Sequence, residues 1–203
     1  MLSIVKEFYS NMLRQDQHKI MVRNVQVSLD PRVINAFYNL PSDIDCEHSK
    51  MVEYIIDKKW SEVLKTLTVK GSLWLDEEGR VMNRIDLKPV AKVWVKFLKS
   101  GLIPTTHTTI ISHERLILLY TILKYLRIDV GKVKERKIRE CAMKKHKTVV
   151  LLFPSLITGI CLVSGVKISV RDESIKNEEA LTVRTVEIIA GKTTAAITQN
   201  MLL

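Results

Sequence analysis

Hydrophobic residues recur every three or four positions along most of this chain, which is the spacing of amphipathic helices. The first such run begins at Ile4 and includes Phe8. Further runs occupy residues 31–40, 51–69, 87–101, 113–126, 131–147 and 149–166. Strict alternation of apolar and polar residues is confined to short stretches. The pattern therefore predicts a mainly α protein with at most a short strand or hairpin near residues 20–29 and 69–82.

Local signals place the ends of two helices. Asp30 precedes Pro31, so an aspartate can cap free amides and a proline can fill the first helical position, where its missing N–H costs nothing. That helix should end near Leu40. Ser112 stands where a hydroxyl can cap the next strongly apolar helix, and Glu114 falls in the first turn, where the helix dipole favours an anion.

Two apolar helices should supply the centre of the core. The helix that begins at residue 113 is apolar on most faces and includes Leu119, which predicts a buried central element. The helix over residues 87–101 should contribute Trp94 to the same cluster. Its apolar positions are Val90, Val93, Trp94, Phe97 and Leu98.

Length and composition predict one domain over residues 1–166 and a loosely ordered tail over 167–203, because 203 residues with 46% hydrophobic content can bury one sizeable core. The three cysteines, Cys46, Cys141 and Cys161, form no C-x-x-C pair, so neither a disulfide framework nor a zinc knuckle is indicated. Together with an N-terminus unlike a secretory signal, they predict an intracellular protein of the nucleus or cytoplasm.

The stretch "PTTHTTIISHERL" concentrates histidines and hydroxyls before the apolar helix, but it does not predict an enzyme. A zinc helix of the H-E-x-x-H type needs its second imidazole at the position that Ile117 occupies. Capping and loop packing explain His107 and His113, with a binding role as the alternative. The late "AGKTT" is half of a phosphate loop, since Val186 replaces the first glycine. No catalytic, cofactor or metal site and no small-molecule substrate is indicated.

A basic segment over residues 131–147 carries eight Lys and Arg against two Glu, a net +6 within a chain whose net charge is +10. Drawn as a helix, it places Lys132, Arg136 and Arg139 on one face, opposite several apolar residues. This face predicts contacts with the phosphates of RNA or DNA. An ordinary solvated face is the alternative, because no aromatic residues interleave with the charges. The candidate nucleic-acid residues are Lys132, Arg136, Arg139, Lys144 and Lys145.

The uncharged segment over residues 149–166 has two interpretations. Its length and flanking lysines are compatible with a membrane span. Pro154 and Gly159 fit a buried helix that begins at the proline. The core helix is the favoured interpretation, and a membrane-tethered protein is the alternative.

One ordered string of residues resembles a known family. It contains the counterparts Pro104, Thr105, His107, Arg115, Leu119, Tyr120, Ile128, Asp129, Val130, Gly131, Phe153, Pro154, Leu156, Ile157, Thr158, Cys161, Gly165 and Val166. In this order they resemble the plant family called "putative plant transposon protein domain", which is similar to open reading frames of Athila-type, gypsy-class retroelements. The resemblance spans most of residues 3–166 and has no counterpart in the tail.

The resemblance and the basic segment together favour a noncatalytic protein derived from a transposable element, Gag-like or associated with nucleic acid. Self-association is compatible with a Gag-like role. A remnant transposase or nuclease is the alternative from another class, and it would need about three converging carboxylates to hold two metal ions. The sequence shows only scattered acids.

Overall fold

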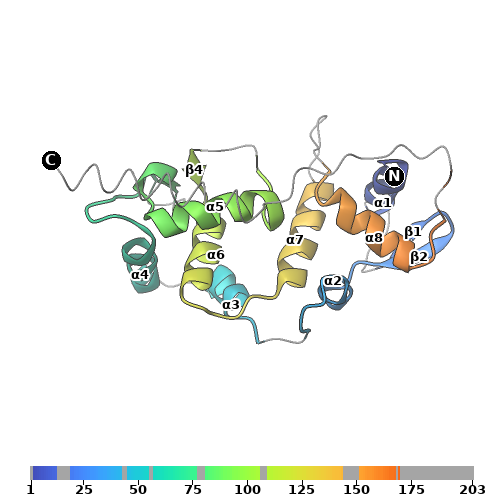
Figure 1. The fold of residues 1–203 in the computed structure, drawn as a ribbon, viewed down its shortest axis with the longest axis horizontal. Helices are drawn as coiled ribbons and strands as arrows, with labels where there is room; N and C mark the ends of the chain where they lie inside the picture. Colours follow the sequence, from blue (N-terminus) through green and yellow to red (C-terminus); the bar gives the residue numbers. More distant parts are fainter. Residues whose placement is uncertain are drawn as a thin grey trace. The chain divides into compact units, whose positions relative to one another are not determined.

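The computed structural model describes residues 2–12, 19–42, 45–54, 57–76, 81–105, 109–143, 151–167 and 169 (Figure 1). Eight α-helices and two small two-stranded sheets account for the regular structure of these residues. The mainly α prediction is therefore confirmed. Residue contacts divide the chain into unit 1, built from Met1–Ile44 and Asp129–Glu179, and unit 2, built around Asp45–Ile128. Almost all of the predicted tail over 167–203 lies outside the described residues, so the division into one domain and a tail stays a prediction.

Unit 1 brings together an early and a late segment of the chain around one hydrophobic cluster. Ile4 and Phe8 of the first helix are almost fully buried in it, together with Ile138 and Ile157 from far along the chain. The N-terminal amphipathic helix predicted from the spacing of apolar residues is therefore present, with its apolar face buried. The elements are α1 (Leu2–Met12), β1 (Lys19–Val22), β2 (Val25–Ser28), α2 (Pro31–Phe37), α7 (Val130–Met143) and α8 (Pro154–Val163).

The predicted hairpin near residues 20–29 is present as β1 and β2. The strands pair antiparallel from Lys19 with Ser28 to Val22 with Val25. Both turn residues, Arg23 and Asn24, have positive φ, at 48° and 62°. A two-residue turn with two left-handed positions matches the twist of the strands it joins.

Helix α7 begins at a buried polar junction with α2. Asp30 accepts a hydrogen bond from the amide of Arg32 at 2.8 Å, which confirms the predicted cap of α2. Asn35 of α2 donates to Asp129 at 2.9 Å and accepts from the amide of Gly131 at 2.8 Å. A Cβ on Gly131 would lie 2.1 Å from the backbone oxygen of Pro31. The glycine therefore permits the close approach of the two helices.

Unit 2 is organised around α6 (His113–Leu123), which packs against the other three helices of this unit. Every residue of α6 from Arg115 to Thr121 is buried, so the predicted central helix is confirmed. Tyr120 donates from its hydroxyl to Glu62 at 2.5 Å and joins α6 to α4. The remaining elements are α3 (Glu47–Tyr54), α4 (Asp57–Leu67), β3 (Met82–Asn83), the 3-10 helix η1 (Arg84–Asp86), α5 (Pro89–Gly101) and β4 (Ile110–Ile111).

The cap of α6 and the buried face of α5 differ from the sequence predictions. Ser112 occupies the N-cap of α6, but its side chain makes no capping hydrogen bond. Helix α5 buries Ala91, Val95 and Leu98, whereas Trp94 is only half-buried and the predicted core residue Phe97 is 42% exposed. The predicted buried face of α5 was therefore wrong by part of a turn. The side of α5 that is buried depends on where α6 packs against it.

The second predicted strand region pairs differently from a simple hairpin. Asp76 and Val81 form one isolated antiparallel bridge, but β3 pairs with β4, which begins at Ile110. A two-residue strand has no detectable alternation, so the sequence pattern contained no signal for β4.

The apolar segment near residues 149–166 forms the short helix α8 of 10 residues. A helix rises 1.5 Å per residue, so this element is about half as long as a membrane core is thick. Among the described residues, none of the helices is long and apolar enough to cross a bilayer. Leu156, Ile160 and Cys161 are instead buried in unit 1, as the core-helix interpretation predicted.

Candidate functional site

Helix α7 separates its apolar residues from most of its charges. Val133, Ile138 and Cys141 are buried, and Gly131 with Asp129 fixes the start of the helix against α2. Asp129 accepts from the amide of Lys132 at 3.0 Å, the position of an N-cap bond. The helix predicted from the basic segment is therefore present, with the predicted apolar side packed in unit 1.

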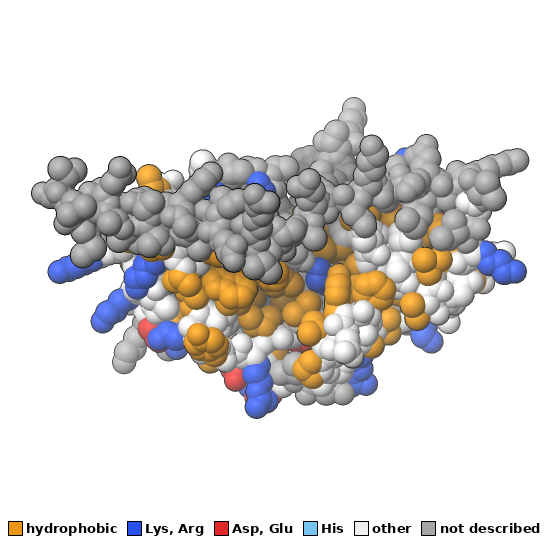
Figure 2. All heavy atoms as spheres, in the orientation of Figure 1, with side chains coloured by type: hydrophobic (Ala, Val, Ile, Leu, Met, Phe, Trp, Pro, Cys, Tyr) orange, Lys and Arg blue, Asp and Glu red, His pale blue; other side chains and the backbone are white. Residues whose placement is uncertain are grey.

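The residues predicted to contact nucleic acid differ in their exposure to solvent. Lys132 is exposed, while Arg136 and Arg139 are half-buried. Lys144 and Lys145 lie outside the described residues. Figure 2 shows Lys and Arg side chains projecting from several places on the face that it draws, with few acidic side chains visible.

Two glutamates on α7 partly neutralise its arginines. Arg136 lies 3.8 Å from Glu140, and Arg139 pairs with Glu135 one turn away. Lys137 also contacts Glu140, at 2.6 Å. These side chains remain partly open to solvent, and solvent-accessible ion pairs typically contribute only about 0–1 kcal/mol to stability. They can therefore be exchanged for phosphate contacts, but they lower the local charge until that exchange occurs.

One basic residue of α7 belongs to the interior. Lys134 is 5% exposed, and its ammonium lies 4.0 Å from the ring centre of Phe153 and 5.1 Å from that of Tyr38. Burial lowers the pKa of Lys134 to about 8. Aromatic faces favour the cation and oppose this effect of burial. Lys134 thus lies between Tyr38, at the end of α2, and Phe153, just before α8, and its charge does not belong to the outer face.

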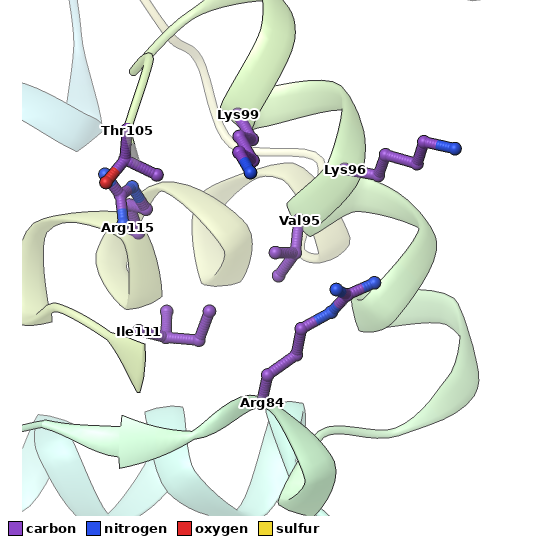
Figure 3. Close-up of a pocket in the computed structure, with 7 residues that line it drawn as sticks. All are labelled: Arg84, Val95, Lys96, Lys99, Thr105, Ile111 and Arg115. Carbon is purple, nitrogen blue, oxygen red and sulfur yellow. The ribbon is translucent and has the colours of Figure 1, made fainter. Parts of the chain in front are cut away.

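A second cationic site lies in unit 2, in a pocket of about 240 Å³ (Figure 3). Arg84 reaches it from η1, Lys99 from α5 and Arg115 from α6. Val95 and Ile111 supply apolar wall. The remaining described residues of its lining are Lys96 and Thr105.

This pocket lies beside the histidine-containing stretch, but the histidines are not among its described lining. His113 is exposed at the start of α6, and His107 lies outside the described residues. Arg115, two residues after His113, is the side chain directed inward; it is 9% exposed. Arg115 was not among the site residues predicted from the sequence. The available signal was a cation immediately before the long apolar run from Leu116 to Leu119.

Metal chemistry has no support from side-chain clustering in the described part of the chain, where no three His, Cys, Asp or Glu residues come together as a metal site. The three cysteines are buried free thiols. Burial raises the pKa of Cys161 to about 12, which keeps that thiol protonated and unreactive at neutral pH.

Comparison with known protein families gives a match over most of the chain. The family model described as "Putative plant retrotransposon-related domain" matches residues 2–167. This range includes all of the helices and strands described above. No curated protein and no solved structure matches the chain.

Proposed function

Because the chain belongs to the family of putative plant retrotransposon-related domains, we propose that it is a noncatalytic nucleic-acid-binding protein of a transposable element. The observation that carries this proposal is the outer face of α7, defined here by Lys132, Arg136 and Arg139. These residues lie on a helix whose opposite side is buried in unit 1. Cations that share one face of a helix can contact phosphates of a nucleic-acid backbone, which supports this proposal.

The geometry favours binding without strong sequence preference. Lysine and arginine contacts to phosphates position a protein on nucleic acid, whereas base-edge contacts specify a sequence. The outer face of α7 has no aromatic side chain for stacking on bases. Its two arginines form ion pairs with Glu140 and Glu135. A Gag-like role, in which many copies coat an RNA, needs only this sequence-independent mode.

Fluorescence anisotropy with labelled single- and double-stranded oligonucleotides tests the proposal. We expect Lys132→Gln, Arg136→Gln and Arg139→Gln together to weaken binding about tenfold or more. A matched control removes the same charge from exposed lysines elsewhere, through Lys6→Gln, Lys19→Gln and Lys65→Gln. This control should bind nearly as well as the parent, because contacts and not net charge determine the loss.

A reciprocal variant makes the test stricter. Replacing Glu135 and Glu140 with glutamine removes the acidic partners of the two arginines. If the outer face of α7 meets phosphates, this double variant should bind several-fold more tightly than the parent. Equal losses in the two triple variants, together with no gain from the double variant, would refute the proposed site.

A further inference from the structure

We propose that the pocket formed by η1, α5, β4 and α6 in unit 2 is a binding site for a phosphate group. This site is separate in the sequence from the outer face of α7 and does not rest on the function proposed above. The proposal comes from a buried arginine and from the charges that surround the same cavity.

Arg115 is the first observation. Arg115 is nine-tenths buried, and its Nε has no hydrogen-bond partner among the residues that the structure describes. A guanidinium N–H that is removed from water without an acceptor is costly, because the lost hydration is not replaced. Glu114, the preceding residue, exerts a favourable electrostatic effect on Arg115, yet burial remains the larger influence and lowers the pKa of the guanidinium. An anion in the pocket would supply the missing partner.

The surrounding charges are the second observation. Arg84, Lys96, Lys99 and Arg115 all line the cavity, and the described lining contains no acid. Figure 3 shows Lys99 directed from α5 toward the space beside Val95, and Arg84 extending from the opposite side, whereas Lys96 points away. Arg84, Lys99 and Arg115 come from three different elements, so the fold places these three cations around one cavity.

The fold fixes the backbone positions from which these side chains extend. The amide of Arg84 donates to the carbonyl of Thr109 at 2.7 Å, next to the pairing of β3 with β4. Lys99 belongs to the helix whose residues Val95 and Leu98 are buried. Arg115 lies on the central helix of the unit. Such preorganisation lowers the entropic cost of binding a small anion.

A phosphate fits this chemistry better than a carboxylate. Two guanidinium groups and an ammonium offer more donors than two carboxylate oxygens accept, and a phosphate presents three or four oxygens to them. Its second negative charge also offsets more of the cationic lining. The apolar walls at Val95 and Ile111 allow the carbon part of a phosphate ester to follow.

Thermal unfolding followed by tryptophan fluorescence tests the site. All three tryptophans, Trp60, Trp74 and Trp94, lie within Asp45–Ile128, so this signal reports unit 2. A ligand that binds only the folded state raises the midpoint as its concentration increases. We expect inorganic phosphate to raise the midpoint progressively, relative to chloride at equal ionic strength.

Variants of the lining identify the cause. Arg115→Met should abolish the phosphate-dependent rise while leaving the midpoint in chloride unchanged or higher, since an apolar side chain of similar length suits a buried position. Lys99→Gln should weaken apparent phosphate affinity by about tenfold, and it keeps the test valid if Arg115→Met does not fold. Lys92→Gln is the matched control from the same helix, because Lys92 does not belong to the described lining of the pocket, and it should respond like the parent. A rise that survives in Arg115→Met, an unchanged phosphate affinity in Lys99→Gln, or no rise in the parent would overturn the proposal.

The source of the phosphate is resolved by two further ligands, an oligonucleotide with a 5′-phosphate and the same oligonucleotide without it. A larger midpoint rise with the phosphorylated strand assigns the pocket to nucleic-acid ends, and a rise with inorganic phosphate alone assigns it to free phosphate. The triple variant of α7 should keep either rise. Failure of the pocket is therefore distinguishable from failure of the outer face of α7.

Discussion

Replacing Gly131 with alanine tests the junction that positions α7. The new Cβ would lie 2.1 Å from the carbonyl oxygen of Pro31 and 2.9 Å from Oδ1 of Asn35. The nearer atom belongs to the backbone, so no side-chain rotation relieves the overlap. Helices α2 and α7 must separate by more than 1 Å at this point to restore an ordinary contact. That movement breaks the hydrogen bond from the amide of Gly131 to Asn35.

The magnitude follows from two costs and one gain. Overpacking of a tight contact costs about 1–3 kcal/mol. A buried polar group that loses its partner costs about 1–3 kcal/mol more. Alanine in place of glycine within a helix returns up to about 1 kcal/mol. We therefore expect Gly131→Ala to lower the free energy of unfolding by about 1–5 kcal/mol.

Urea unfolding followed by far-UV circular dichroism measures this loss, and tryptophan fluorescence reports unit 2 in the same samples. Two other glycines serve as controls. A Cβ on Gly159 would meet only the ring of Phe37, at 2.4 Å, and that half-exposed side chain can rotate away. A Cβ on Gly101 would meet nothing closer than 4.0 Å. The predicted order of destabilisation is Gly131, then Gly159, then Gly101. Equal effects at Gly131 and Gly101 would refute the close approach.

The interior of each unit provides further predictions. Leu119→Ala should lower the free energy of unfolding by about 2–5 kcal/mol, because Leu119 is fully buried. His113→Ala should change it by less than about 0.5 kcal/mol, because His113 is exposed. Urea unfolding compares the two variants, and similar losses would contradict the assignment of α6 as the central helix. Burial lowers the pKa of Lys134 to about 8, so between that pH and the unfolded-state pKa near 10.4 only the unfolded chain binds the proton. This residue therefore makes stability rise with pH over that window, and it is most destabilising below pH 8. Lys134→Met should raise the unfolding free energy at pH 7 by about 1–3 kcal/mol and should flatten the dependence on pH above 8, as measured by urea unfolding at several pH values. An unchanged pH profile would show that the aromatic rings fully offset the burial.

Local signals in the sequence predicted local structure well. Asp30 caps α2 as expected, because a side chain and an amide two residues away need no help from the rest of the fold. The dense apolar run of α6 also identified the central helix, since such a run cannot remain in water on any face.

Features that depend on distant partners were not predictable. The buried pair of Asn35 and Asp129 joins residues 94 positions apart. The inward face of α5 depends on where α6 lies, and β4 exists only because β3 pairs with it. The site role of Arg115 was not predictable either, because the pocket that it lines with other cations exists only in the folded unit 2.

The central claim is that the outer face of α7 contacts phosphates, and its most direct test is the salt dependence of nucleic-acid binding. Each neutralised phosphate contributes roughly 0.7–0.9 to the slope of log affinity against log salt concentration. The triple variant of Lys132, Arg136 and Arg139 to glutamine should therefore lower the parent slope by about 2–3 while its circular dichroism spectrum stays unchanged. The control triple variant of Lys6, Lys19 and Lys65 should keep the parent slope. An α7 variant with the same slope and affinity as the parent would show that this face is an ordinary solvated surface.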